Sequence, residues 1–286
     1  MITAAIGLGL TVAVAAHSSA GGRRTSTSGD ELASIQKRGV LVVATNPQYP
    51  PASFLDPSGK WKGFDIDVAT KVADALGVKV KFITPAWAVM TSGHWSGRWD
   101  IEVGSMDPIA TRQKVLNFID PPYYYLPASV AVASDSKFTA VSQLNGKRVG
   151  GNGGTTYQAY AEGTLALPVI PYDGKGHLVT PAFRAKFKGY ASDTNALQDL
   201  SLGSGVRLDA VIAAPTVIKA AIKNGLKVKL LGKPIFREPL AIGADRSANS
   251  QSLTQKIDTL IAKWHKDGTL SKLSIHWFGL DYSVAK

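Results

Sequence analysis

A group of small and polar residues near position 105 has the types and spacing of an anion-binding site. A short apolar run ends in Gly104 and Ser105, whose small size lets the backbone approach a ligand closely. Asp107 then predicts a helix N-cap, Pro108 suits the first helical position, and Arg112 follows one turn later. Backbone N–H groups, the helix dipole and a guanidinium would together favour a carboxylate. An ordinary cap at Asp107 and a surface salt bridge at Arg112 would explain the same residues.

The stretch from Gly104 to Tyr124 resembles the polar amino-acid-binding proteins of bacterial ABC importers. The resemblance is carried by Gly-Ser-Met-Asp-Pro-Ile-Ala-Thr-Arg-Gln-Lys-Val, by Phe-Ile-Asp-Pro-Pro-Tyr-Tyr, and by Gly-Phe-Asp-Ile-Asp ahead of a predicted helix. Matching motifs recur in order over residues 32–279. The resemblance implies an α/β fold of two lobes with a hinge of two crossing segments. It also implies the substrate-binding component of an ABC importer, with no catalytic residue, metal or cofactor.

The resemblance implies where a ligand carboxylate would bind. Arg112 would hold the α-carboxylate, and the turn Gly151 to Tyr157 would offer a backbone N–H and a hydroxyl from the second lobe, at Thr155 and Thr156. This turn lacks the spacing of a dinucleotide-binding or P-loop motif, so we reject both of those readings.

Two aromatic residues follow predicted strands of the first lobe. Tyr49 and Asn46 lie in a proline-rich loop after the strand Val40 to Ala44, and Trp87 lies in a loop after the strand Val78 to Thr84. Open α/β sheets bind ligands at the carboxyl ends of their strands. The resemblance implies that Tyr49 and Trp87 enclose the ligand side chain. The predicted ligand-binding residues are Asn46, Tyr49, Trp87, Gly104, Ser105, Asp107, Arg112, Thr155 and Thr156.

The chain departs from the family pattern at one acidic position. The acid that pairs with the ligand ammonium is replaced by Ala214, and Asp107 stands where the family has Ser or Thr. Either Asp107 has taken over the ammonium, or Asp107 only caps a helix and the ligand lacks a primary α-amine. Asn46 replaces an acid common in binders of cationic side chains, which favours a neutral polar or aromatic side group.

Composition restricts the classes of function. The net charge of +11 is spread along the chain, which indicates a basic globular protein and no nucleic-acid partner. The absence of cysteine excludes disulfides, thiolate metal sites and a cysteine nucleophile. The five histidines are dispersed, and no Ser-His-Asp order or metal spacing is present.

The N-terminus predicts secretion. Residues 1–20 have the apolar run and small-residue cleavage site of a signal peptide, although no Lys or Arg precedes the run. Residues 21–30 predict a flexible linker. We assign residues 31–126 and 234–286 to lobe 1 and residues 127–233 to lobe 2, with 165–187 as a surface insertion. The expected location is periplasmic or extracellular.

The leading hypothesis is therefore a monomeric binding protein that delivers an amino acid or related carboxylate-bearing metabolite to a membrane permease. The alternative is a secreted enzyme on the same fold, resembling cyclohexadienyl dehydratases that act on prephenate or arogenate. That chemistry needs a general acid in the cleft, and Ala214 removes one place for it. A sensory or adhesive ectodomain is a third class, and no second membrane segment follows to support a receptor.

Overall fold

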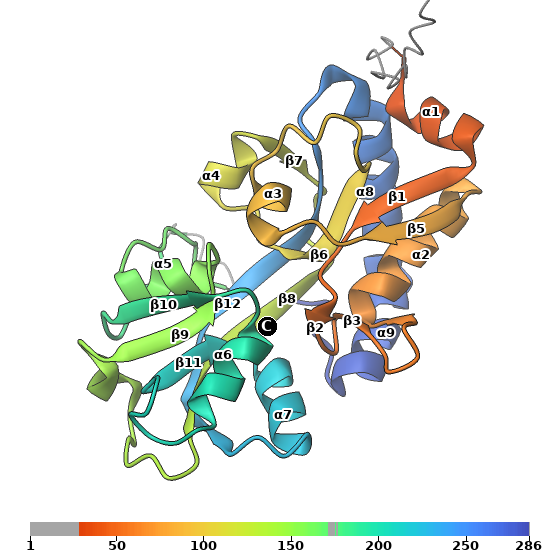
Figure 1. The fold of residues 1–286 in the computed structure, drawn as a ribbon. Helices are drawn as coiled ribbons and strands as arrows, with labels where there is room; N and C mark the ends of the chain where they lie inside the picture. Colours follow the sequence, from red (N-terminus) through yellow and green to blue (C-terminus); the bar gives the residue numbers. More distant parts are fainter. Residues whose placement is uncertain (1–28, 171–174, 176, 286) are drawn as a thin grey trace, which may run out of the picture.

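The computed structural model describes residues 29–170, 175 and 177–285. The predicted signal peptide and all but the last two residues of the predicted linker lie outside the described residues. Within the described part, strands and helices alternate and form two lobes joined by two long strands (Figure 1). The predicted α/β class, with two lobes and two crossing segments, is confirmed. Among the described residues, no helix combines the length and apolar character needed to cross a membrane.

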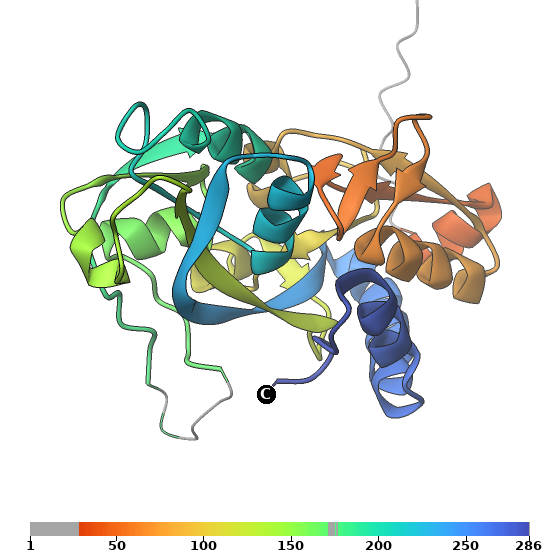
Figure 2. The same ribbon diagram turned by 90° about the horizontal axis from the view of Figure 1, so that it is seen from below.

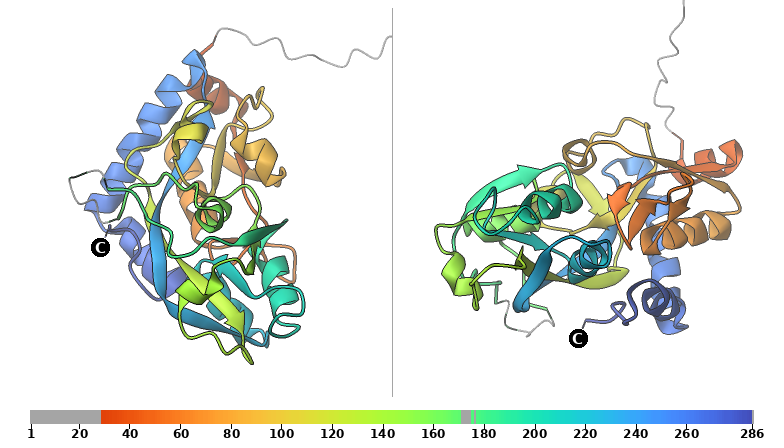
Figure 3. Two further views of the ribbon diagram at one scale, coloured as in Figure 1. Left: turned by 90° about the vertical axis from the view of Figure 1, so that its left-hand side faces the viewer. Right: turned by 60° about the horizontal axis from the view of Figure 1, so that its bottom comes forward.

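Parallel strands form the centre of the first lobe. The apolar strand β1 (Val40–Ala44) lies between β5 (Lys79–Ile83) and β6 (Ile101–Met106) and runs parallel to both. A small antiparallel sheet sits beside them, made of β2 (Gln48–Tyr49), β3 (Ser53–Leu55) and β4 (Trp61–Lys62). The helices of this lobe are α1 (Glu31–Arg38), α2 (Phe64–Leu76), α3 (Trp87–Thr91), α4 (Ala110–Gln113), α8 (Gln251–Lys266) and α9 (Thr269–Phe278), and the lobe also holds β7 (Leu116–Phe118) and the 3-10 turn η2 (Ala248–Ser250). The C-terminal helices α8 and α9 pack on α1 and α2 (Figure 3).

The second lobe repeats the arrangement on a smaller scale. Strand β9 (Arg148–Asn152) lies between β10 (Lys186–Tyr190) and β11 (Ala210–Ala213), parallel to both. Its helical elements are η1 (Val141–Leu144), α5 (Thr156–Glu162), α6 (Asp193–Leu200) and α7 (Pro215–Lys223). The predicted insertion 165–187 contains an isolated bridge between Pro168 and Leu178, and its end is already part of β10.

Two antiparallel strands run through both lobes. Strands β8 (Tyr124–Ala133) and β12 (Val228–Asp245) pair along most of their length, with a shift of register between Leu231 and Phe236. Strand β12 also pairs with β6 of the first lobe, and β8 pairs with β11 of the second (Figure 2). The two sheets are therefore continuous through these strands, which are the two connections a hinge requires.

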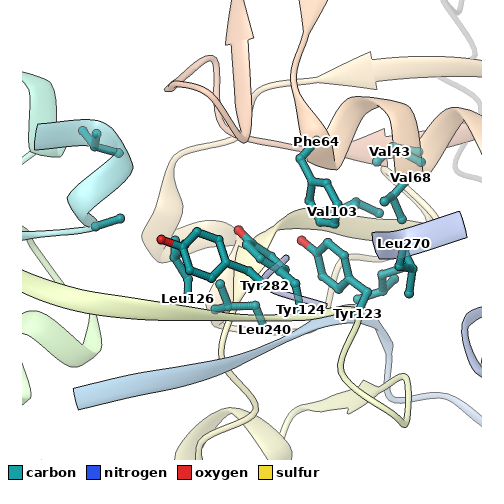
Figure 4. Close-up of a cluster of buried hydrophobic side chains, with 14 of the residues drawn as sticks. Val43, Phe64, Val68, Val103, Tyr123, Tyr124, Leu126, Leu240, Leu270 and Tyr282 are labelled. Carbon is teal, nitrogen blue, oxygen red and sulfur yellow. The ribbon is translucent and has the colours of Figure 1, made fainter. Parts of the chain in front are cut away.

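An aromatic cluster fixes the start of β8 to the first lobe. The ring of Phe64 stacks on that of Tyr123, with centroids 5.8 Å apart (Figure 4). The ring of Tyr124 stacks on that of Phe278, with centroids 5.7 Å apart. The Tyr123 hydroxyl donates a hydrogen bond of 2.8 Å to the buried carboxyl of Asp65. Burial of such rings stabilises packing strongly, so this end of the crossing strand is held rigidly to the first lobe.

Several element boundaries differ from those expected. Trp87 was predicted in a loop, but it begins the short helix α3. Helix α6 starts at Asp193, because the Ser192 hydroxyl accepts a hydrogen bond from the Asn195 N–H as an N-cap. This start places Asp193 at the edge of the second lobe that faces the first.

Candidate functional site

A small pocket lies between the two lobes. Its empty volume is about 370 Å³, including space open to solvent. Eight of the nine predicted site residues line it, and Arg112 does not. The lining residues are Asn46, Tyr49, Trp87, Gly104, Ser105, Asp107, Asn152, Thr155, Thr156, Tyr157, Asp193 and Glu238.

The topology explains why residues far apart in sequence meet here. The segments after β1, β5 and β6 contribute Asn46, Trp87 and Asp107 from the first lobe. The segments after β9 and β10 contribute Thr155 and Asp193 from the second. The pocket thus lies at the carboxyl ends of the strands of both lobes, which is where open α/β sheets bind ligands.

Arg112 lies behind the pocket wall and forms an ion pair with Asp107. Its Nη1 donates to a carboxylate oxygen of Asp107 and to the main-chain oxygen of the same residue, the latter at 3.2 Å. The predicted N-cap role of Asp107 is wrong: α4 starts only at Ala110, its N-cap is Ile109, and no side chain caps it. The ion pair to Arg112 has replaced the capping hydrogen bond.

Arg112 also links the two lobes. Its Nη2 donates a hydrogen bond of 3.0 Å to the main-chain oxygen of Gly154, and the indole Nε1 of Trp87 donates to the same oxygen at 3.3 Å. The guanidinium carbon lies 5.1 Å from the centre of the Trp87 ring, a cation–π distance. The Tyr49 and Tyr157 hydroxyls meet across the pocket at 3.4 Å. These contacts describe a closed cleft.

Gly104 and Ser105 line the pocket through their backbone. A Cβ on Gly104 would lie 2.7 Å from a carboxyl oxygen of Glu102, so the buried Glu102 side chain would have to shift to admit a larger residue. The Ser105 hydroxyl donates to Asp65 at 2.7 Å and lies 2.5 Å from the Tyr124 hydroxyl, and its N–H donates to the Tyr123 hydroxyl at 3.1 Å. Both the hydroxyl and the N–H of Ser105 are therefore engaged with Asp65 and the two tyrosines.

Three further predicted residues already make local hydrogen bonds. The Asn46 side chain accepts from the Gln48 N–H at 2.8 Å, and the Thr155 hydroxyl donates to the Asn152 main-chain oxygen at 2.7 Å. The Thr156 hydroxyl donates to a carboxyl oxygen of Glu238 and lies 3.5 Å from a carboxyl oxygen of Asp107. Thr156 of the second lobe therefore contacts two acids of the first lobe instead of facing empty space.

Sequence reasoning missed two acidic residues of the pocket. It left Asp107 as the acid of the site, but Asp193 and Glu238 also line the pocket. Ala214 is fully buried and is not among the lining residues. Asp193 follows a strand and a Ser N-cap, which is the same signal that identified Asp107. Glu238 is an acid within the largely apolar second half of β12, a pattern that also signals function.

The acids of the pocket are held away from water. Burial raises the pKa of the Asp193 carboxyl to about 7, although the Asn152 N–H donates to it at 2.8 Å and opposes this effect. Burial, and then the neighbouring Asp107 carboxylate, raises the pKa of Glu238 well above its usual range. Behind the wall, burial raises the pKa of Asp65 to about 6 and that of Glu102 well above its usual range. The described residues contain no cluster of three His, Asp or Glu side chains that could hold a metal ion.

Comparisons with known proteins match this architecture. The sequence profile of the family described as bacterial extracellular solute-binding proteins, family 3, matches residues 41–280. An L-cystine-binding protein of Bacillus subtilis strain 168 is 29% identical over 299 residues, covering 99% of this chain and 100% of that protein.

Solved structures agree with that match. An ancestral amino acid-binding protein, described as a precursor of cyclohexadienyl dehydratase, superposes with a TM-score of 0.72 at 29% identity, over 86% of this chain and 99% of that chain. The substrate-binding protein of an amino acid ABC transporter gives a TM-score of 0.69 at 27% identity, over 84% of this chain and 100% of that chain.

Proposed function

Because this chain belongs to the bacterial extracellular solute-binding proteins of family 3, we propose that it is the substrate-binding component of an ABC importer. It captures an amino acid or a related carboxylate-bearing metabolite between its lobes and presents it to a membrane permease. The observation that carries this proposal is the pocket between the lobes, which takes its lining from both of them. Contacts drawn from both lobes favour the closed form, so binding shifts the population toward closure.

The polar groups of the pocket support a charged metabolite as ligand. Arg112 is the proposed anchor for a carboxylate, and its guanidinium already touches both lobes through Asp107 and Gly154. A ligand carboxylate shares this guanidinium with Asp107, so the two residues act together. Tyr49 and Trp87 supply aromatic surface to the remainder of the ligand.

The lobe boundaries remain part of the proposal. Residues 31–126 and 234–286 form lobe 1, residues 127–233 form lobe 2, and the hinge lies near 124–128 and 233–239. The pairing of β8 with β12, with its register shift after Leu231, supports a bend at this place. We also propose that residues 1–20 direct secretion and that the protein acts as a monomer.

The test is to identify the solute that the protein retains. Purified protein is denatured, and the small molecules it releases are identified by mass spectrometry. The released solute is then titrated into protein that has been unfolded, washed and refolded. Calorimetry should show one site with a dissociation constant below about 10 μM, or roughly −7 kcal/mol. Turnover of prephenate or arogenate by the same protein would contradict a pure binding role.

A further inference from the structure

The pocket holds more acid than its one nearby cation can balance. Its lining includes the carboxyl groups of Asp107, Asp193 and Glu238 but no Lys or Arg. Arg112 is the basic side chain behind the wall, and it is paired with Asp107. Within the described part of the chain, no basic side chain makes an ion pair with Asp193 or Glu238. These two acids therefore face the pocket without a countercharge from the protein.

Asp193 offers an unused acceptor. Its side chain is 2% exposed, and one oxygen, Oδ1, accepts the Asn152 N–H at 2.8 Å. The other oxygen, Oδ2, is buried and has no hydrogen-bond partner. An unpaired buried carboxylate oxygen is costly, so its place on the pocket wall indicates a partner that arrives with the ligand.

Glu238 of β12 forms a carboxyl pair with Asp107. Glu238 is 3% exposed, accepts a hydrogen bond from the Thr156 hydroxyl, and lies beside the Asp107 carboxylate. Asp107 is balanced by Arg112, but among the described residues Glu238 has no cation beside it, so Glu238 holds a proton in the unliganded protein. A cationic nitrogen has the charge needed to replace that proton.

We propose that the captured solute carries a protonated nitrogen, an ammonium or guanidinium group, and that Asp193 and Glu238 receive it in place of the acid absent at Ala214. This assignment rests on the proposed function of the pocket and specifies the class of its solute. The nitrogen donates to the free Asp193 Oδ2 and to Glu238, and Tyr49 and Tyr157 line the same pocket. The nitrogen need not be a primary α-amine, because a secondary ammonium would suit the same two acids.

The experiment uses a series of probes that differ in charge. L-lysine, 6-aminohexanoate, cadaverine and norleucine each carry a protonated nitrogen, and adipate carries none. Calorimetry measures the dissociation constant of each probe, and of the solute released from the purified protein. These measurements are made on the parent protein and on three variants, Asp193→Asn, Glu238→Gln and Glu162→Gln. Glu162 is an exposed acid of the same lobe and serves as the matched control. Thermal melting reports whether each variant folds.

The expected result is that every binding solute carries a protonated nitrogen. Both pocket variants should weaken binding at least tenfold, or about 1.4 kcal/mol, while Glu162→Gln binds like the parent. Calorimetric titrations near pH 6, repeated in buffers of different ionisation enthalpy, give the number of protons released when the solute binds. The parent should release protons on binding, and Asp193→Asn and Glu238→Gln should each release fewer. A merely structural effect of the substitutions would not change proton release.

Two outcomes overturn the assignment. One is a released solute or tightly bound probe without a protonated nitrogen, and the other is unchanged affinity in both Asp193→Asn and Glu238→Gln. If the protein releases no solute and binds no probe, the proposed function itself fails. The two failures are therefore distinguishable.

Discussion

The guanidinium of Arg112 is paired with the carboxylate of Asp107, and their side chains are 4% and 5% exposed. The two charges cancel inside the protein, so neither residue can be removed without leaving the other buried and unpaired. Breaking a buried pair from one side is much more costly than the net energy of the pair. The two positions therefore connect ligand binding to the stability of the cleft.

We predict that Arg112→Ala weakens binding of a carboxylate-bearing solute at least tenfold and lowers unfolding free energy by about 3 kcal/mol. The loss of stability follows because Asp107 remains as a buried charge. Calorimetry and thermal denaturation check the two effects. Arg207→Ala removes an exposed arginine and should change neither quantity by much. Less than a tenfold loss of affinity in Arg112→Ala would contradict the anchoring role.

We predict that Asp107→Asn destabilises the unliganded protein by about 1–3 kcal/mol, because Arg112 loses its charged partner. Sequence reasoning alone predicts an almost unchanged melting temperature, since Asn replaces Asp well as a helix cap. A solute with a primary ammonium should bind more weakly to this variant, and a solute without one should bind equally or more tightly. The exposed Asp74→Asn is the control. An unchanged melting temperature would show that the ion pair with Arg112 does not stabilise the unliganded protein.

We predict that Gly104→Ala impairs both folding and binding, whereas Gly153→Ala does not. A Cβ at Gly104 would press against Glu102 at 2.7 Å, while one at Gly153 meets only ordinary contacts of 3.6 Å or more. Overpacking of this kind costs about 1–3 kcal/mol. Denaturant unfolding and calorimetry on both variants test the contrast, and equal behaviour would show that the wall at Gly104 can yield.

We predict that Asp193 lowers the free energy of unfolding of the unliganded protein at neutral pH. Its pKa is raised to about 7 in the folded protein from an ordinary value of 3.8, so the folded state holds a proton that the unfolded state has released. Stability should therefore fall as pH rises from about 4 to 7. Asp193→Asn should remove this fall and stabilise the unliganded protein by about 2–4 kcal/mol at pH 8 but little at pH 4. Unfolding curves of both proteins with the same pH slope would contradict it.

The same group makes binding depend on pH. A cationic solute binds when Asp193 is ionised, so its affinity should decrease as the pH falls below about 7, the pKa of this carboxyl group. The decrease should be up to about tenfold per pH unit for each proton that the solute displaces. The other charged and titratable groups of the pocket are Glu238, Tyr49, Tyr157 and Asp107, which is paired with Arg112 behind the wall. Titration of the solute at several pH values tests this, and a flat profile in the parent would contradict it.

The sequence was sufficient to predict eight of the residues that line the pocket. It was not sufficient to predict the ion pair between Asp107 and Arg112. Asn46, Trp87 and Asp107 follow strands whose apolar runs are readable, and parallel strands bring their carboxyl ends together. The partner of Asp107 was not predictable in this way, because a local capping pattern and an ion pair to Arg112 require the same residues.

The two missed acids have different explanations. Asp193 follows β10, and that strand was hidden because its start was read as part of the insertion 165–187. Glu238 lies in the 18-residue strand β12, whose register shift decides which side chains face the pocket. Register across a bulge depends on tertiary pairing, so sequence periodicity does not reveal it.

We propose that the two lobes close on a small solute, and small-angle scattering measures this closure directly. Protein freed of solute by unfolding and refolding is measured alone and with a saturating amount of the solute that it released. We predict that the radius of gyration is smaller with solute than without it, because cross-lobe contacts such as that of Trp87 with Gly154 then form in most molecules. Identical scattering curves from proven solute-free and saturated protein would contradict it.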